Sequence, residues 1–162
     1  MIKIREVKAR DRKNIYEMIQ QDDKFKPGEL EAILHRIDHY LFDTDQSLFK
    51  AIIAEDQFKE LVGYAVYGPD PHAVGTYQIY NLVHSPSIKN NEVILQLLLF
   101  IENDLLKNKV RIIVCELSSN LQYENQYEMY SNQNYILSSR INNFYSEGED
   151  KLILSKNISP KY

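Results

Sequence analysis

The sequence predicts a mixed α/β domain in which helices pack against one central sheet. The first observation is length, because 162 residues suffice to bury a hydrophobic core without staples. The second is periodicity: apolar residues alternate in some segments and recur three or four positions apart in others. The third is the element order, which is strand, two helices, three strands, helix, strand, helix and two strands. We therefore expect one domain over residues 1–162.

The N-terminal elements follow from capping residues and apolar spacing. Ile2 and Ile4 alternate with charged residues, which predicts a strand. Asp11 is placed to cap a first helix, and Pro27 opens a second one. The apolar residues of the second helix form one stripe, at Leu30, Ile33, Leu34, Ile37 and Leu41.

The rest of the chain alternates between strands and helices. Strands are expected at residues 48–54 and 61–67, and the segment YGPDP should end the second one because proline cannot continue a ladder. Residues 92–106 are apolar nearly all round, which predicts a helix packed deeply against the sheet. The other predicted elements are strands at 76–83, 110–117, 135–141 and 151–158, and a short helix with Tyr123, Tyr127 and Tyr130 on one face.

Composition excludes several classes of partner. The net charge of -4 offers no basic field for nucleic acid. The longest apolar stretch, residues 93–101, contains Gln96 and is far shorter than the roughly 20 residues of a membrane span. The N-terminus lacks the apolar centre of a signal peptide. Cys115 is the single cysteine and lies in an apolar run, which predicts a buried thiol in a cytoplasmic protein.

Several blocks of sequence carry more specific information. In order they are FKPGELEAILHRIDHYL, VGYAVYGPDP with GTYQIYNLVHSP, ELSSNLQYENQYEMYSNQNY, and RINNFYSEGEDK. Together they resemble the GNAT family of N-acetyltransferases over nearly the whole chain. The first block resembles the helix that forms one wall of the substrate cleft. The others resemble the third and fourth strands, the fifth strand with its following helix, and the closing strand pair.

The resemblance implies a mostly antiparallel sheet of about seven strands flanked by four helices. It also implies that the fourth and fifth strands splay apart and that acetyl-coenzyme A, the acyl donor, wedges between them. The pyrophosphate would rest on backbone N–H groups at the start of the helix after the fourth strand. The residues that this places beside the donor are Leu82, Val83, His84, Lys89, Asn90, Asn91, Glu92, Val93 and Ile94.

The phosphate-binding segment departs from the family pattern of glutamine or arginine, two variable residues, glycine, one variable residue, then glycine or alanine. Lys89 stands in the first position and could reach a phosphate, but Glu92 and Ile94 occupy the two small-residue positions. We expect Ile94 to block close approach of the backbone and Glu92 to compete with phosphate for the helix N-terminus. Like charges about 4 Å apart repel by about 4 kcal/mol near a protein surface, so we expect weak donor binding.

The resemblance assigns the proton donor for the departing thiolate to a tyrosine on the helix after the fifth strand, which here is Tyr130. With 12 tyrosines in the chain, a purely structural role for Tyr130 is the alternative. The fourth-strand acid of many relatives is replaced by Gln78, which leaves Glu116 as the candidate base. A strand-end carboxylate satisfied by backbone donors is the other interpretation of Glu116.

The acceptor pocket is assigned to side chains from the third and fourth strands and the closing hairpin. These are Tyr67, Asp70, Tyr80, Phe144 and Tyr145. His35, Asp38 and His39 share a helix face, but no third zinc ligand is visible beside the histidine pair and we expect no metal.

The predicted function is acetyl transfer from acetyl-coenzyme A to an amine on a small molecule or a peptide. The alternative is a non-catalytic module that has lost donor binding and binds a ligand or a protein partner. A third possibility is an enzyme with a different acyl donor. A homodimer is compatible with either function.

Overall fold

The computed structural model describes residues 1–22, 25–45, 48–88 and 90–159. They form one seven-stranded sheet in the order β1-β2-β3-β4-β5-β7-β6, in which only the β4–β5 pair is parallel. The strands are β1 (Lys3–Glu6), β2 (Lys50–Glu55), β3 (Leu61–Pro69), β4 (Thr76–His84), β5 (Ile112–Ser118), β6 (Ile136–Ser146) and β7 (Glu149–Asn157). This arrangement confirms the predicted fold class.

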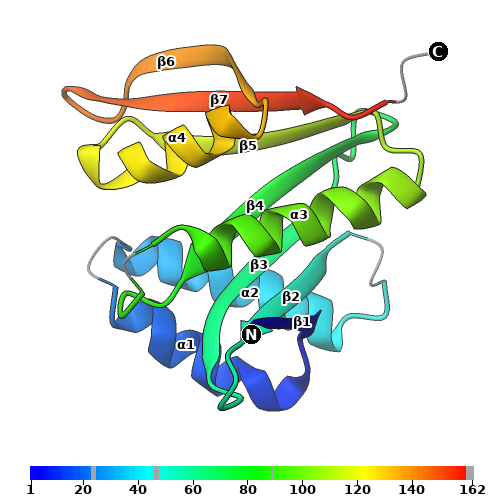
Figure 1. The fold of residues 1–162 in the computed structure, drawn as a ribbon. Coiled ribbons are helices and arrows are strands. Elements are labelled where there is room, and N and C mark those ends of the chain that lie inside the picture. Colours follow the sequence, from blue (N-terminus) through cyan, green and yellow to red (C-terminus); the bar gives the residue numbers. More distant parts are fainter. Residues whose placement is uncertain (23–24, 46–47, 89, 160–162) are drawn as a thin grey trace.

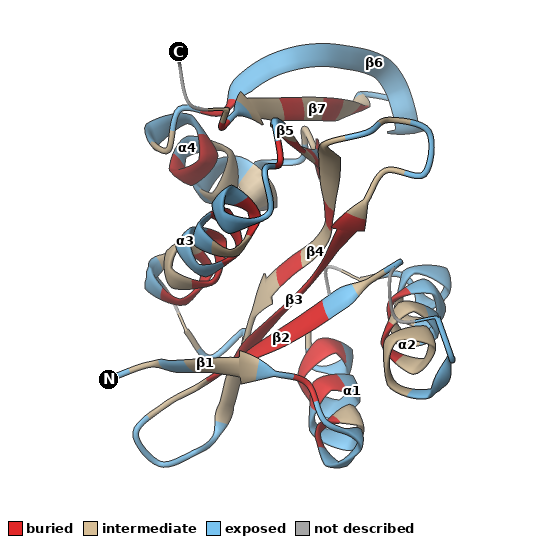
Figure 2. Cartoon of the chain, turned by 90° about the vertical axis from the view of Figure 1, so that its right-hand side faces the viewer, coloured by how far each residue is buried: buried red, intermediate tan, exposed pale blue. Residues whose placement is uncertain are grey.

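Helices cover both faces of the sheet, two on each side (Figures 1 and 2). The α-helices are α1 (Arg12–Gln20), α2 (Pro27–Phe42), α3 (Glu92–Lys107) and α4 (Glu124–Asn132), and short 3-10 turns precede α1 and α4 at Ala9–Asp11 and Leu121–Tyr123. One hydrophobic core joins α1 and α2 to the sheet, through residues such as Ile19 and Ile37. A second core joins α3 and α4 to the opposite face, through residues such as Leu98 and Tyr130.

The interior strand β5 lies between β4 and β7, as expected for the predicted central strand. It begins at Ile112, two residues later than predicted, and its burial alternates, with Ile113, Cys115 and Leu117 buried. Cys115 is only 2% exposed, which confirms the buried thiol, and burial raises its pKa to about 12.

Two local predictions need correction. Asp11 occupies the N-cap position of α1, but its carboxylate makes no capping bond to that helix and instead accepts hydrogen bonds from the Lys8 amide and from Arg5. The strand β3 does end within YGPDP, as predicted, but it ends at Pro69, two residues beyond the predicted end at residue 67. Gly68 makes this extension possible, because a Cβ there would lie 2.1 Å from the Leu48 carbonyl oxygen.

The sheet opens between β4 and β5. Their parallel pairing covers only residues 76–79 and 112–115. Beyond that point β4 stays paired with β3, and β5 stays paired with β7, so the two strands diverge toward their carboxyl ends. Figure 1 shows the resulting separation between the β1–β4 half of the sheet and the β5–β7 half. Within the described residues, no helix combines the length and apolar character that crossing a bilayer requires.

Candidate functional site

A cavity of about 350 Å³ lies where β4 and β5 diverge. Four parts of the chain enclose it: the N-terminal end of α2, the carboxyl end of β4, the segment from β5 into α4, and the β6–β7 hairpin. Its lining residues are Phe25, Lys26, Glu29, Tyr80, Asn81, Leu82, Val83, Glu116, Ser118, Asn120, Tyr123, Gln126, Tyr145 and Glu149. Parallel strands that diverge at their carboxyl ends provide a common location for ligand sites in α/β proteins.

Three carboxylates reach this cavity from different elements. Glu116 of β5 is paired with Lys151 of β7 at 2.6 Å. Glu149 accepts hydrogen bonds from Ser118 at 2.5 Å and from Ser146 at 3.2 Å. Glu29 accepts a hydrogen bond from the Lys26 amide at 2.8 Å, which closes the first turn of α2. The site therefore concentrates negative charge in one enclosed space.

Tyr80, Tyr123 and Tyr145 line the cavity, and their raised pKa values reflect burial and the neighbouring carboxylates. Burial, followed by the charges of Glu29, Asp22 and Glu149, raises the pKa of Tyr123 to about 12. Burial and the surrounding glutamates, Glu116 first, also raise the pKa of Tyr145. Each carboxylate disfavours a further negative charge nearby and would favour a positive one. The tyrosines consequently stay neutral at physiological pH and offer hydroxyl groups and aromatic faces.

Two further lining residues refine the polarity of the cavity. The Oδ1 atom of Asn81 is buried and has no hydrogen-bond partner among the described residues. This atom is shielded from solvent, so it marks an unpaired polar group behind the cavity wall. Lys26 is the single basic residue among the described lining residues, against three carboxylates. The cavity is therefore suited to a ligand that carries positive charge.

Gln126 of α4 spans the opening between the two halves of the sheet. Its Nε2 donates a hydrogen bond to the Leu82 carbonyl of β4 at 3.2 Å. A second, small cavity of about 30 Å³ lies beyond this contact, and His84 and Ile94 line it together with Gln126, Leu82 and Val83. Gln126, Leu82 and Val83 thus line both cavities, and the hydrogen bond stands between them.

Tyr130 lies inside the protein and is 1% exposed. Burial, followed by the neighbouring Cys115, raises the pKa of its hydroxyl group well above the usual value, and Gln126, one turn earlier on α4, lowers it. Tyr130 is not among the described residues that line either cavity, whereas Gln126 lines both. The packing of its ring against Tyr135, at 5.0 Å between centroids, holds the phenol in place.

The start of α3 is organised by asparagines. The Asn90 side chain accepts a hydrogen bond from the Glu92 amide at 3.1 Å, and the Asn91 side chain donates one to the Asn125 carbonyl of α4 at 2.9 Å. The Glu92 carboxylate accepts a hydrogen bond from Gln96, one turn along the helix. Ile94 is 3% exposed and belongs to the core. Its side chain also lines the small cavity, and its predicted effect on close approach of the backbone stays a prediction. Lys89 lies outside the described residues.

The structure brings together about half of the residues that the sequence singled out. Tyr80, Leu82, Val83, Glu116 and Tyr145 line the larger cavity, and His84 and Ile94 line the smaller one. Val93 is buried beside Ile94 in the core.

Three predicted acceptor residues lie elsewhere. Tyr67 is buried and donates a hydrogen bond to Asp104 of α3, in a separate cavity beside β2. Asp70 accepts hydrogen bonds from Gln78 and from the His72 amide, in the turn after β3. Phe144 is half exposed on β6 and stacks edge-on against Tyr145, with the Lys151 ammonium group over its ring.

The histidine face of α2 holds no metal cluster in the described part of the chain, where no group of three or more suitable ligands occurs. Asp38 is bound by Arg12 through two hydrogen bonds, and His39 is paired with Asp43.

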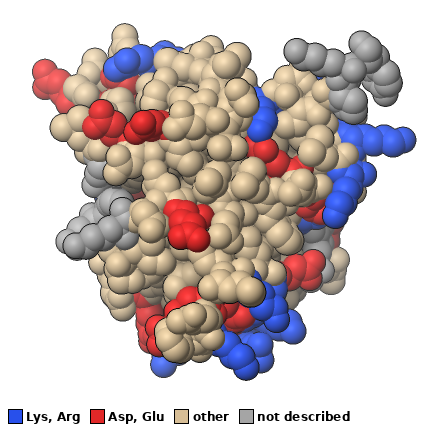
Figure 3. All heavy atoms as spheres, viewed as in Figure 1, with Lys and Arg blue, Asp and Glu red and all other residues tan. Residues whose placement is uncertain are grey.

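Lys and Arg side chains on the face that carries α3 and α4 lie mostly toward its right-hand and lower edges, and the greater part of that face is uncharged (Figure 3).

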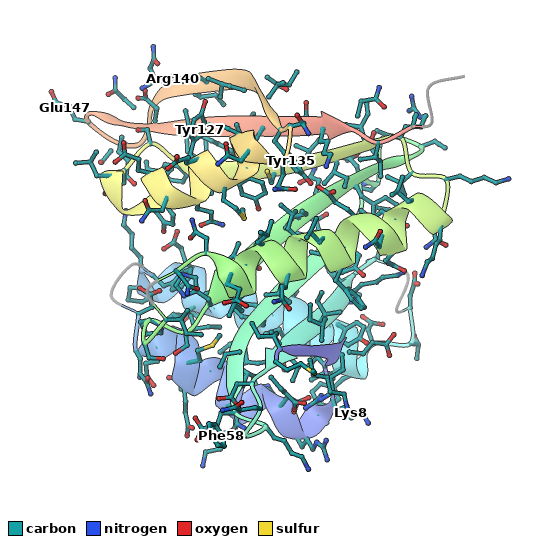
Figure 4. All side chains as sticks on the ribbon, viewed as in Figure 1. Lys8, Phe58, Tyr127, Tyr135, Arg140 and Glu147 are labelled. Carbon is teal, nitrogen blue, oxygen red and sulfur yellow. The ribbon has the colours of Figure 1, made fainter. Side chains whose placement is uncertain are left out.

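Sequence reasoning missed Glu29, Tyr123, Gln126 and Glu149 as members of the site. Glu29 lies in the block that resembles the wall helix of the substrate cleft, so that signal was present. Glu149 lies in the closing-hairpin block. The hairpin carries Arg140 and Glu147 and lies beside α4, which carries Tyr127 (Figure 4). Gln126 had no signal in the sequence, because its role depends on a contact with a strand 44 positions away.

No protein-family model and no curated protein sequence matches the chain. Solved structures do match it. A GNAT-family protein from Desulfovibrio desulfuricans superposes with a TM-score of 0.89 at 22% identity and covers 98% of this chain and 100% of its own. The ribosomal-protein-S18-alanine N-acetyltransferase from Escherichia coli superposes with a TM-score of 0.81 at 15% identity. The match covers 100% of this chain and 97% of that enzyme. An aminoglycoside 6'-N-acetyltransferase complexed with coenzyme A superposes with a TM-score of 0.75 at 16% identity, and the match covers 99% of each chain.

Proposed function

Starting from a chain that has the GNAT fold, we propose that it is an N-acetyltransferase that transfers an acetyl group from acetyl-coenzyme A to a cationic amine. The observation that carries the proposal is the cavity at the divergence of β4 and β5, with Glu29, Glu116 and Glu149 around it. The similar structures support the donor, because one of them is complexed with coenzyme A.

The acceptor is an amine that carries positive charge, either on a small molecule or on a peptide. Carboxylates from three elements attract such a ligand, and the aromatic faces of Tyr80, Tyr123 and Tyr145 can contact its ammonium groups. The amine must lose a proton before it attacks, so a carboxylate beside the reacting nitrogen is required. The similar structures include an aminoglycoside N-acetyltransferase and a ribosomal-protein-S18-alanine N-acetyltransferase, which supports both small molecules and proteins as acceptor classes.

Acetyl-coenzyme A supplies the thioester whose carbon–sulfur bond breaks as the amine nitrogen bonds to the carbonyl carbon. Leu82 and Val83 of β4 lie beside the route of the thioester arm, and Asn90 and Asn91 lie at the helix start where phosphates would bind. Glu116 accepts the proton that the amine loses, directly or through a water molecule. Tyr130 supplies a proton to the departing thiolate. Lys151 holds the Glu116 carboxylate in position from β7.

The test is an acetyl-transfer assay that measures free thiol released from acetyl-coenzyme A. The acceptor panel contains a linear polyamine, an aminoglycoside, a peptide with a free N-terminus, a neutral hydroxylamine ether and an acidic amino acid. We expect release with the cationic members and none with the neutral or acidic ones. Glu149→Gln keeps the shape of the side chain and should raise the KM of the acceptor about tenfold, because a hydrogen bond to a charged group is lost.

The matched control is Glu147→Gln, at the exposed tip of the same hairpin and outside the cavity lining (Figure 4). It removes the same charge and should leave the acceptor KM unchanged. A preference for neutral or acidic acceptors would overturn the cationic-amine assignment. The absence of thiol release with every acceptor, together with no coenzyme A binding by calorimetry, would support the non-catalytic binding module instead.

A further inference from the structure

We propose that Gln126 is a gate in the donor channel. Its hydrogen bond to the Leu82 carbonyl holds the channel closed. The inference rests on the proposed function, because the donor that must pass this point is coenzyme A. It adds a residue that the sequence did not single out.

The first argument is position. A donor that reaches from the start of α3 to the reacting amine must pass from the small cavity at His84 and Ile94 into the large one at Glu116. Four residues line both cavities: Phe25, Leu82, Val83 and Gln126. The contact between Gln126 Nε2 and the Leu82 carbonyl, at 3.2 Å, therefore lies at the boundary that the two cavities share.

The second argument is size. The small cavity has a volume of about 30 Å³, against about 350 Å³ for the large one. A space of the smaller size holds no more than a few water molecules and cannot accept a pantetheine chain. The two halves of the sheet must separate there, or the Gln126 side chain must swing aside. Of these, a side-chain rotation is the smaller change, because it breaks a single neutral hydrogen bond at this point.

The third argument connects the gate to the proposed acid. Gln126 lies one turn before Tyr130 on α4, its side chain bonds to β4, and it lowers the pKa of the buried Tyr130 phenol, an effect that requires the two groups to be close. Movement of Gln126 away from the Leu82 carbonyl would therefore also change the surroundings of Tyr130. Donor entry and a change at the proposed proton donor would then be coupled.

The closed state should weaken donor binding in a calculable way. When only a fraction of the molecules is open, the apparent dissociation constant is the intrinsic one divided by that fraction. A neutral hydrogen bond inside a protein changes such an equilibrium by about two- to tenfold. Gln126→Ala, and Gln126→Met, which keeps the length of the side chain but has no N–H donor, should therefore bind coenzyme A about two to ten times more tightly than the natural chain.

Calorimetric titration with coenzyme A, which has no acetyl group and cannot turn over, measures this directly. The matched control is Glu128→Ala, an exposed position on the same helix. A second measurement follows the side-chain amide signals of the natural chain by nuclear magnetic resonance, with the Gln126 signal identified from its loss in Gln126→Ala. We expect coenzyme A to shift the Gln126 signal and to leave the Gln133 signal in place.

Equal or weaker binding by both Gln126 variants, with measurable binding by the natural chain, would overturn the gate and leave the proposed function standing. A Gln126 signal that does not move when coenzyme A binds would overturn it as well. Failure of the natural chain and of both variants to bind coenzyme A would overturn the gate together with the proposed donor. Thermal melting of each form, measured in parallel, identifies any variant that fails to fold.

Discussion

Single side chains carry the chemistry proposed here, and Tyr130 shows how much their surroundings decide. Its phenol is buried, and burial raises its pKa well above the usual value. The raised pKa keeps the proton on the hydroxyl group at physiological pH and makes the phenol a weak acid toward a departing thiolate. The same burial would serve a purely structural residue, so a substitution must separate the two roles.

Replacing Tyr130 with phenylalanine removes the hydroxyl group and keeps the ring that packs against Tyr135. We expect turnover to fall about a hundredfold, the magnitude of a lost general acid, with coenzyme A affinity changed far less. Steady-state kinetics and calorimetric titration of the variant check the two quantities separately. An active enzyme whose turnover survives the substitution would assign Tyr130 to packing alone.

Gly68 is a second residue whose surroundings determine its identity. A Cβ at this position would lie 2.1 Å from the Leu48 carbonyl oxygen, which belongs to the backbone and cannot turn away. We expect Gly68→Ala to lower the free energy of unfolding by at least about 1–3 kcal/mol, the usual cost of overpacking. At Gly28 an added Cβ meets nothing within 4 Å, so Gly28→Ala should be neutral or stabilising. Urea denaturation of both variants makes the comparison.

At the scale of elements, the start of α3 is where the proposed function places the phosphates of the donor. A helix N-terminus attracts anions through its unpaired N–H groups and the helix dipole. Here the Asn90 side chain already accepts a hydrogen bond from the Glu92 amide, and the Glu92 carboxylate adds a negative charge in the first turn. The contact of that carboxylate with Gln96 directs it along the helix, which reduces the repulsion of a phosphate without removing the charge.

Glu92→Gln removes this charge and keeps the length of the side chain. We expect coenzyme A to bind several times more tightly, because a like charge near the phosphates is lost, and the gain should shrink as salt is added. Replacing Ile94 with glycine in addition would remove a core side chain at a cost of several kcal/mol. Titrations at low and high salt test the prediction, and a gain that salt does not alter would argue against an electrostatic cause.

At the scale of the whole molecule, a small network of ion pairs joins the N-terminal strand β1 to its neighbours. Arg5 of β1 pairs with Asp11 at 2.7 Å and with Glu55 of β2 at 2.5 Å. Burial of Asp11 raises the pKa of its carboxyl group, but the hydrogen bonds from Arg5 and the Lys8 amide outweigh it, and the net pKa is lowered. Arg5 also lowers the pKa of Glu55, and Arg12 lowers the pKa of Asp38.

These shifts predict loss of stability in acid. A carboxyl group whose pKa is lower in the folded state binds fewer protons there than in the unfolded chain, so stability rises with pH between the two pKa values. The contribution is complete above the unfolded values of about 4 and is lost as the pH falls through the folded ones. Urea midpoints should be level from pH 7 to 5 and should fall below pH 4. The Arg5→Met variant should have a lower free energy of unfolding than the natural chain at pH 7. Its free energy of unfolding should fall less than that of the natural chain when the pH is lowered below 4.

The amino-acid sequence by itself determined the order and kind of the elements, because hydrophobic periodicity and the punctuation by proline and glycine are local properties. The blocks that resemble the GNAT family predicted the fold, and Tyr80, Glu116 and Tyr145, which they singled out, line the cavity where β4 and β5 diverge. Tertiary structure decided the rest. Tyr67 and Asp70 sit on the expected strand and turn, yet their side chains are bound to Asp104 and Gln78.

Gln126 shows the physical reason most clearly. Nothing in its local sequence distinguishes it from other polar residues of a short helix, and its importance comes from a hydrogen bond to a strand 44 positions away. The orientation of a side chain depends on partners supplied by distant parts of the chain, whereas periodicity reports only whether a position faces the core. Sequence therefore predicts where in the fold a site lies, and packing decides which side chains line the cavity there.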